Sequence, residues 1–268
     1  MFNYKFKRRE KMYFDTHAHY DDEKFDENRD ILIEEMHSNG VDYIINIGSD
    51  MESSVKSMEL AKKYDFIYAA VGVHPHEVRD MTEADIERLR EYSKYEKVVA
   101  IGEIGLDYYY DFSPRDKQRY WFERQLELAA ELDLPVSIHS RDAAQETFDI
   151  IKNSRVRKGV IHAYSGSVEM ARDYIDMGFY IGVGGVVTFK NAKKLIDVVR
   201  FAPVERILLE TDSPYLSPVP LRGTVNNSQN LKYVADKIGE IKQISPEKVC
   251  EITSQNAKVI FWQKKVVA

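Results

Sequence analysis

Histidines follow the ends of apolar segments throughout this 268-residue sequence. The first two, His17 and His19, come soon after the apolar run at residues 12–14 and are separated by one alanine. Side chains two residues apart on an extended chain point to the same face, so the two imidazoles are predicted to lie side by side. Such a pair can chelate a divalent metal ion. Six of the seven histidines occupy strand-end positions of this kind.

Polar residues at the ends of other apolar runs enlarge this candidate site. They are His74, His76, Glu103, His139, His162 and Asp212. A catalytic zinc ion takes about three protein ligands and keeps one position for water, so this set exceeds the needs of one ion. Two ions about 3.5 to 4 Å apart, bridged by a carboxylate, would use it fully. The sequence therefore predicts two divalent ions. Imidazoles suit zinc, whereas carboxylates and a phosphate substrate also suit magnesium or manganese.

Eight apolar runs alternate with segments of helical periodicity and would position these residues. The predicted strands are residues 12–16, 43–48, 66–73, 98–103, 135–139, 159–162, 179–183 and 206–211. Helices are predicted between them, for example over residues 28–39, before Gly40, and over residues 118–132, which carry an apolar stripe. This order is typical of an α/β protein with a parallel sheet, and eight units close into a (β/α)8 TIM barrel. The carboxyl ends of the barrel strands would then bring the polar residues together.

An open doubly wound sheet is the structural alternative. It would usually show a glycine-rich phosphate loop after the first strand, where this chain has His17-Ala-His19-Tyr20. Residues 12–268 are predicted to form a single domain, with a long active-site loop at residues 214–230. Ser245-Pro246-Glu247 predicts the start of the last helix, and the segment from Asp142 to Gln145 resembles a capping box.

Composition and charge limit the classes of protein. The chain has 44% hydrophobic and 31% charged residues, and no apolar run approaches the ~20 residues of a membrane span. Its net charge of −6 argues against a broad basic face for duplex nucleic acid, although a short groove could still hold a strand end. Residues 1–11 carry five basic side chains and one acid, and are predicted to be a poorly ordered basic extension. The single cysteine, Cys250, is predicted to pack in a helix, and the lack of an export signal favours the cytoplasm.

Six motifs follow one another along the chain. They are Asp15-Thr-His17-Ala-His19, Gly72-Val-His74-Pro-His76, Gly102-Glu103-Ile-Gly105-Leu-Asp107-Tyr108, Ile138-His139-Ser140-Arg141, His162-Ala-Tyr164-Ser165-Gly166 and Glu210-Thr-Asp212-Ser213-Pro214. In order and spacing they resemble the TatD-type metal-dependent deoxyribonucleases of the amidohydrolase superfamily. The resemblance extends over residues 12–261 and is specific because all six motifs are present.

The resemblance implies a metal-dependent hydrolase that cleaves phosphodiester bonds of DNA at strand ends or in single strands. It also implies that His17, His19 and Asp212 hold one ion, that His139 and His162 hold the other, and that Glu103 bridges them. The family commonly has a Glu-Pro pair after Arg-Gly-x-x-Asn in the loop following the last strand. Here Asn227 and Ser228 follow Arg222–Asn226, so substrate contacts of this loop are expected to differ, whereas the ligands are not affected.

Catalytic roles can be assigned as hypotheses. Asp212 is predicted to take the proton of the attacking water, because a carboxylate that binds metal can also act as a base. His74 is predicted to contact the scissile phosphate or the leaving group, and the alternative is that it orients a metal ligand. His76 is a candidate substrate contact that could instead only shape its turn.

Aromatic and basic residues near the predicted strand ends are candidates for holding the substrate. The run at residues 108–112, beginning with Tyr108, offers rings on which bases could stack, worth ~1 to 3 kcal/mol per base. Packing against the helix layer is the alternative for some of these rings. Arg141 and Arg222 could meet phosphates or form surface ion pairs, and Tyr164 is a further candidate contact.

Two other functions are compatible with the same residues. A small-molecule hydrolase acting on a lactone, cyclic amide or phosphotriester could use the same barrel, because one metal centre supports many reactions. A metal store or scaffold would instead have a closed ligand shell. No obligate protein partner is evident, and His37, inside the first predicted helix, is interpreted as structural.

Overall fold

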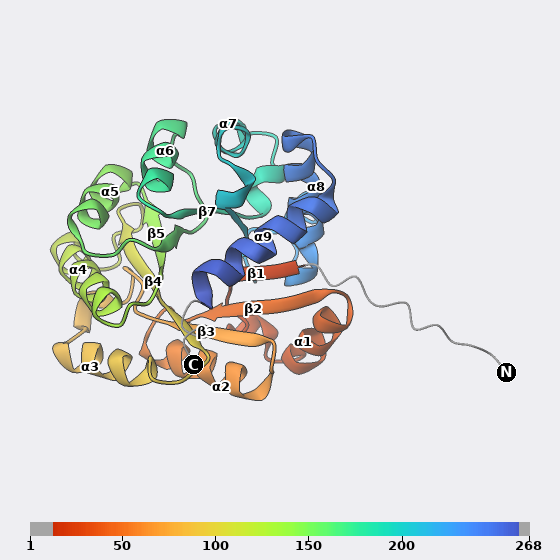
Figure 1. Ribbon diagram of the computed structural model, residues 1–268. Coiled ribbons are helices and arrows are strands. Elements are labelled where there is room, and N and C mark those ends of the chain that lie inside the picture. Colours follow the sequence, from red (N-terminus) through yellow and green to blue (C-terminus); the bar gives the residue numbers. More distant parts are fainter. Residues whose placement is uncertain (1–12, 263–268) are drawn as a thin grey trace.

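The computed structural model describes residues 13–262, in which eight strands alternate with helices (Figure 1). The strands are β1 Tyr13–Ala18, β2 Val41–Ile47, β3 Ile67–Val71, β4 Val98–Asp107, β5 Val136–Arg141, β6 Gly159–Ile161, β7 Tyr180–Val183 and β8 Ile207–Leu209. The α-helices are α1 Arg29–Ser38, α2 Met51–Lys63, α3 Glu83–Tyr92, α4 Arg115–Glu131, α5 Ala144–Asn153, α6 Val168–Asp176, α7 Lys193–Phe201, α8 Leu231–Lys242 and α9 Pro246–Phe261. Short 3-10 helices are η1 Glu23–Phe25, η2 Val78–Asp80, η3 Gly185–Thr188, η4 Val204–Arg206 and η5 Ser228–Asn230. The predicted basic extension, residues 1–11, lies outside the described residues.

The eight strands pair in sequence order, and each is parallel to the next. The first and last strands meet through the segment that follows β8. Ala18 bridges to Ser213, the amide of Asp212 donates to the carbonyl of His17 (2.9 Å), and the amide of His19 donates to the carbonyl of Ser213 (2.8 Å). The predicted (β/α)8 barrel is confirmed, and the doubly wound alternative is wrong because its strands would not run in sequence order.

Apolar side chains close one end of the barrel. Those that fill it are Phe14, Ile45, Ile47, Ala70, Val99, Ala100, Val160, Tyr180 and Leu208, joined by Ala257, Ile260 and Phe261 of α9. Helix α9 crosses the barrel over β1 in Figure 1 and covers this cluster. A second core lies between the strands and the surrounding helices. The polar strand ends are therefore left at the opposite mouth of the barrel.

Local signals explain where several helices begin and end. Helix α1 is followed by Gly40 in a left-handed conformation (φ 102°), which a residue with a side chain rarely adopts. Helix α9 begins as predicted, because the Ser245 side chain accepts from the amide of Lys248 and Pro246 occupies the first turn. The capping box predicted at Asp142 is wrong. Asp142 has φ 52°, whereas a capping residue is extended, and α5 begins without a side-chain cap.

None of the helices within residues 13–262 combines the length and apolar character needed to cross a bilayer.

Cys250 packs inside α9, as predicted, and is 1% exposed. Burial, with the charges of Glu247 and Asp236, raises the pKa of its thiol to about 12. Because the thiolate is the reactive form, we expect the native protein to resist alkylation by iodoacetamide at pH 8, and one thiol per chain to react after unfolding in urea. Mass spectrometry of the alkylated protein measures both states. Rapid modification of the folded chain would contradict this packing.

Candidate metal centre

Glu103 lies in the middle of the polar mouth, and five imidazoles have a nitrogen within 4 Å of its carboxylate. Its side chain projects from β4 and is 6% exposed. One oxygen, Oε2, lies 3.4 Å from His17 Nε2, and the other, Oε1, lies 3.0 Å from His139 Nδ1. The Nε2 atoms of His74 and His162 each lie 3.9 Å from Oε1. The two oxygens of Glu103 therefore face different groups of histidines, which is the geometry that a bridging carboxylate needs.

His17, His19 and Asp212 form the first group of donors, together with Glu103. The Nε2 atoms of the two histidines are 3.2 Å apart, and Asp212 Oδ1 lies 3.5 Å from His19 Nε2 and 3.9 Å from His17 Nε2. In a tetrahedral site with ligand distances of about 2.0 to 2.1 Å, neighbouring donor atoms lie roughly 3.3 Å apart. The donor spacing thus fits one divalent ion.

The orientation of the two histidine rings supports the same conclusion. His19 Nδ1 lies 2.9 Å from the carbonyl oxygen of Ile47, which can only accept, so Nδ1 carries a proton and Nε2 is the nitrogen that faces the centre. His17 Nδ1 lies 3.2 Å from Ser137 Oγ, which leaves its Nε2 facing the same point. The two Nε2 atoms, 3.2 Å apart, thus face one point, where both rings in their neutral form could bind a cation. The donor set is therefore suited to a cation.

His139 and His162 form the second side of the centre. His139 Nε2 lies 3.1 Å from Asp107 Oδ2, which holds the ring with Nδ1 toward Glu103. His162 Nδ1 lies 3.2 Å from Glu210 Oε2, and its Nε2 lies 3.6 Å from Asp212 Oδ1. In each case one ring nitrogen faces a carboxylate and the other faces the centre, which is the usual arrangement around a metal-binding histidine.

His74 also lies close to Glu103 and His139, and by spacing alone these three could hold an ion. Its Nδ1, however, accepts a hydrogen bond from the backbone amide of His76 (3.2 Å). A neutral imidazole that accepts at Nδ1 carries its proton on Nε2, so the Nε2 of His74 is a donor. Burial and the neighbouring histidines hold the pKa of His74 well below its usual value, which keeps the ring neutral. This state favours the predicted contact with a phosphate or a leaving group over metal binding.

The charges at the mouth are strongly coupled. Burial alone would raise the pKa of Glu103, but the imidazoles of His17 and His74 outweigh it and hold this pKa well below its usual range. Although burial lowers the pKa of His19, its contacts with Asp212 and Glu103 raise it to about 9. Both carboxylates therefore stay ionised near neutral pH and attract positive charge to this buried place.

Three buried carboxylates support the centre in addition to the residues predicted from the sequence. They are Asp15, Asp107 and Glu210. Asp15 accepts from the amide and hydroxyl of Thr211 (3.0 and 2.6 Å) and from the hydroxyl of Ser228 (2.6 Å), which ties β1 to the chain after β8. The signal was present for two of them, because Asp15 and Glu210 stand two residues before the ligands His17 and Asp212 on extended chain.

The predicted substrate contacts fall into two classes in the structure. Tyr108 is held by the helix layer, since its hydroxyl donates to Glu146 (2.7 Å) and Arg115 covers its ring. Tyr164 is 4% exposed and donates to the carbonyl of Ser167. Arg222 lies over the ring of Phe189 (3.9 Å), beyond β7.

His76 and Arg141 form the second class and lie beside residues of the centre. His76 Nε2 lies 2.9 Å from Asp107 Oδ2, the oxygen that also contacts His139. The guanidinium of Arg141, at the end of β5, lies over the rings of Tyr109 and Tyr110. It makes no ion pair with a carboxylate among residues 13–262, so the predicted alternative of a surface ion pair does not hold for it.

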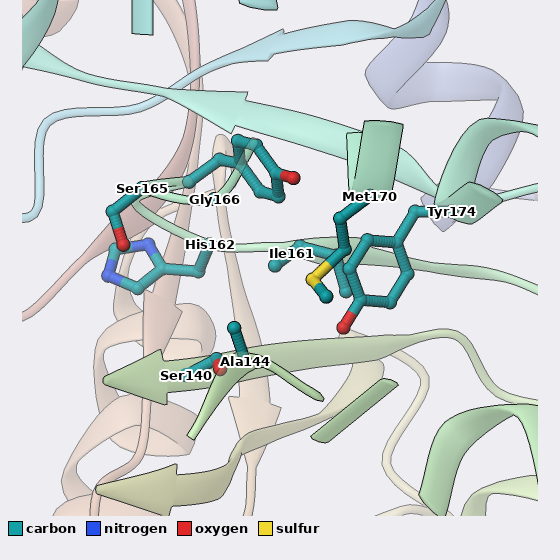
Figure 2. A pocket seen from close by; sticks show the side chains of 9 residues that line it. Ser140, Ala144, Ile161, His162, Ser165, Gly166, Met170 and Tyr174 are labelled. Atoms are coloured by element: carbon teal, nitrogen blue, oxygen red, sulfur yellow. The ribbon is translucent and has the colours of Figure 1, made fainter. Parts of the chain in front are cut away.

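A small pocket opens beside His162, between the ends of β5 and β6 and the first turns of α5 and α6 (Figure 2). Its polar side presents His162, Ser140 and Ser165, and its inner end is lined by Ile161, Met170 and Tyr174. The mixed lining places a hydrogen-bonding rim next to a candidate ligand.

Gly105 lets β4 approach β5 at His139. It has φ +147°, and a Cβ atom there would lie 1.9 Å from the His139 carbonyl oxygen. We expect Gly105→Ala to lower the free energy of unfolding by about 2 to 3 kcal/mol and to weaken metal binding, because β5 must shift. Gly223→Ala is the matched control, since Gly223 also has positive φ (+86°) but no atom within 4 Å of the added Cβ. Urea unfolding and metal analysis after dialysis test the pair, and equal effects would rule out the close approach.

Comparison with known proteins gives a consistent result. The family model described as TatD related DNase matches residues 14–262. A protein of Bacillus subtilis named as an uncharacterized metal-dependent hydrolase, YabD, is 45% identical over 93% of this chain and 99% of its own length. A protein of a Rahnella species named 3'-5' ssDNA/RNA exonuclease TatD is 32% identical over 89% of this chain and 94% of its own length.

The fold comparison agrees. The crystal structure of YjjV, a TatD homologue from Escherichia coli, superimposes with a TM-score of 0.88 at 31% identity, covering 93% of this chain and 97% of that one. The residues matched by the family model include all the strand ends that carry the candidate ligands. This chain belongs to the TatD related DNase family of metal-dependent hydrolases.

Proposed function

We propose that this protein is a nuclease that hydrolyses phosphodiester bonds at the ends of single-stranded DNA through a binuclear centre. The proposal is carried by the convergence of Glu103 and Asp212 with five imidazoles at the barrel mouth, all within 4 Å of a carboxylate oxygen. Phosphodiester hydrolysis needs positive charge on the phosphoryl oxygens and a base for water, and this group offers both. The name of the Rahnella relative supports the same substrate class.

The residues would hold the ions as follows: His17, His19 and Asp212 on one side, His139 and His162 on the other, with Glu103 between. When bound, divalent ions would supply Lewis acidity toward the phosphate and lower the pKa of water. Asp212 takes the proton of the attacking water at a carboxylate oxygen, and its low pKa means that it is ionised and ready to accept. His74 donates from Nε2 to a phosphate or leaving-group oxygen. Asp107 and Glu210 keep the rings of His139 and His162 in place.

The test is metal reconstitution of the full chain with end-labelled oligonucleotides. After dialysis against a chelator, the protein is assayed with zinc, magnesium or manganese on matched single-stranded and double-stranded substrates. We expect mononucleotides to be released from single strands, no activity without metal, and recovery with at least one ion. Turnover of a lactone, cyclic amide or phosphotriester without action on DNA would assign a small-molecule hydrolase instead. Tightly held metal without any turnover would assign a metal store or scaffold.

A further inference from the structure

Three aromatic rings and one arginine form an exposed group beside the metal centre. We call Tyr109, Tyr110, Phe112 and Arg141 the aromatic platform. The three aromatic residues are 58%, 46% and 55% exposed, respectively. Tyr110 and Phe112 are stacked with their ring centres 5.1 Å apart, and the Arg141 guanidinium lies 4.1 Å from the centre of Tyr109 and 4.7 Å from that of Tyr110. Single exposed rings are common on proteins, but three on one short loop, two of them against a guanidinium, are a reason to look for a ligand.

The loop that carries these rings is held rigidly. Asp107 Oδ1 accepts from the amides of Tyr109 (3.0 Å) and Tyr110 (2.9 Å). The buried side chain of Gln118 accepts from the amide of Asp107 and donates to the carbonyls of Asp107 and Ser113. The loop backbone therefore has the same arrangement before and after a ligand binds. Binding then costs little conformational entropy of the loop.

The same aspartate connects the platform to the metal centre. Its other oxygen, Oδ2, lies 2.9 Å from His76 Nε2 and 3.1 Å from His139 Nε2. The His76 ring packs edge-on against Tyr110 and Phe112, with ring centres 5.4 and 4.8 Å apart. A ligand that lies on the platform is thus a short distance from Glu103 and the candidate ligands.

The chemistry of the platform selects the kind of ligand. Flat apolar faces accept other flat rings, and a guanidinium without a carboxylate partner among the described residues accepts an anion. A single-stranded nucleic acid offers both, because its unpaired bases expose their faces and its backbone carries phosphates. The bases of a duplex are stacked inside the helix and cannot lie on these rings.

We propose that the aromatic platform binds unpaired bases of a single-stranded nucleic acid next to the phosphodiester at the metal centre, with Arg141 on a neighbouring phosphate. This inference rests on the proposed function and names the feature that makes the enzyme select single strands. Tyr108 does not take part, because its hydroxyl and ring are already bound to Glu146 and Arg115.

Binding of fluorescent oligonucleotides tests the platform. Dissociation constants are measured by anisotropy for Tyr109→Ala, Phe112→Ala and the double variant, on a single strand and on the same strand with abasic sites. We expect each substitution to weaken binding of the intact strand by about tenfold and to change binding of the abasic strand by less than about twofold. Tyr120→Ala removes an equally exposed ring (47%) from α4, whose hydroxyl contacts Glu83. It is the matched control and should bind like the unchanged protein. Phe112→Tyr should keep the affinity.

The outcomes separate the two proposals. If the unchanged protein cuts single strands but the alanine variants bind intact and abasic strands with unchanged affinity, the proposed role of the platform is wrong. The nuclease assignment would then stand. Equal weakening on intact and abasic strands would also overturn the platform, because the rings would then not act through bases. If the unchanged protein neither binds nor cuts any strand with any metal, the proposed function itself fails.

Discussion

Replacing Asp212 by asparagine is expected to reduce turnover by about 10² to 10⁴-fold while the protein keeps its fold and part of its metal. The loss of the general base explains the size of this reduction, because general base catalysis contributes a rate factor of about 10² to 10⁴. Asp212 adopts a left-handed backbone (φ 57°), which asparagine tolerates better than most residues, so this substitution separates chemistry from backbone strain. His17 and His19 remain as donors. The measurements are kcat on end-labelled single strands, metal content after dialysis, and thermal unfolding.

The control for this variant is Asp133→Asn. Asp133 has nearly the same backbone angle (φ 52°) but follows α4 at the opposite end of the barrel, where it pairs with Lys158. The Asp133→Asn variant should have a kcat within about twofold of that of the unchanged protein, because a surface ion pair contributes little to stability. An Asp212→Asn variant as active as the original protein would end the assignment of Asp212 as the base.

Glu103→Gln is expected to weaken metal binding by more than about 100-fold and to abolish detectable turnover. Glutamine keeps the shape of the side chain but loses the charge, and its amide nitrogen donates where the ligand must accept. Replacing partners outside the ligand set typically costs 10 to 100-fold in affinity, so a residue between both donor groups should cost more. Metal analysis after dialysis against a weak chelator, together with the oligonucleotide assay, measures both effects.

Glu59→Gln is the matched control for this second substitution. Glu59 is exposed on α2, outside the mouth, and should behave like the unchanged protein. Retention of the full metal content by Glu103→Gln would show that Glu103 does not bridge the two donor groups. The activity loss would then need another cause.

The eight strands were predictable because each is a compact apolar run between turn residues, as in residues 179–183, which contain β7, and residues 206–211, which contain β8. Parallel strands in a closed barrel also share one polar end, so His17, Glu103 and Asp212 could be grouped without seeing them. The exact ends of the strands were predicted least accurately. The fourth strand continues to Asp107, four residues beyond its predicted end, because Gly105 allows close pairing with His139.

The remaining features depend on contacts between segments that no local pattern records. Nothing in the run of aromatics after β4 indicates that Tyr108 turns toward Glu146 while Tyr109 stays exposed. The capping motif at Asp142 failed because its backbone angle is set by the surrounding chain. The closure of the barrel beyond β8, through Ala18 and Ser213, likewise requires the two ends of the sheet to meet.

The candidate ligands come from many separate strands, whereas the aromatic platform comes almost wholly from one loop that is fastened at both ends by Asp107 and Gln118. Such a loop is a module in the evolutionary sense. Exchanging residues 108–113 would alter what lies at the entrance while the donor atoms stay on their strands, so such an exchange would change the preference for a substrate and leave the catalytic chemistry as it is.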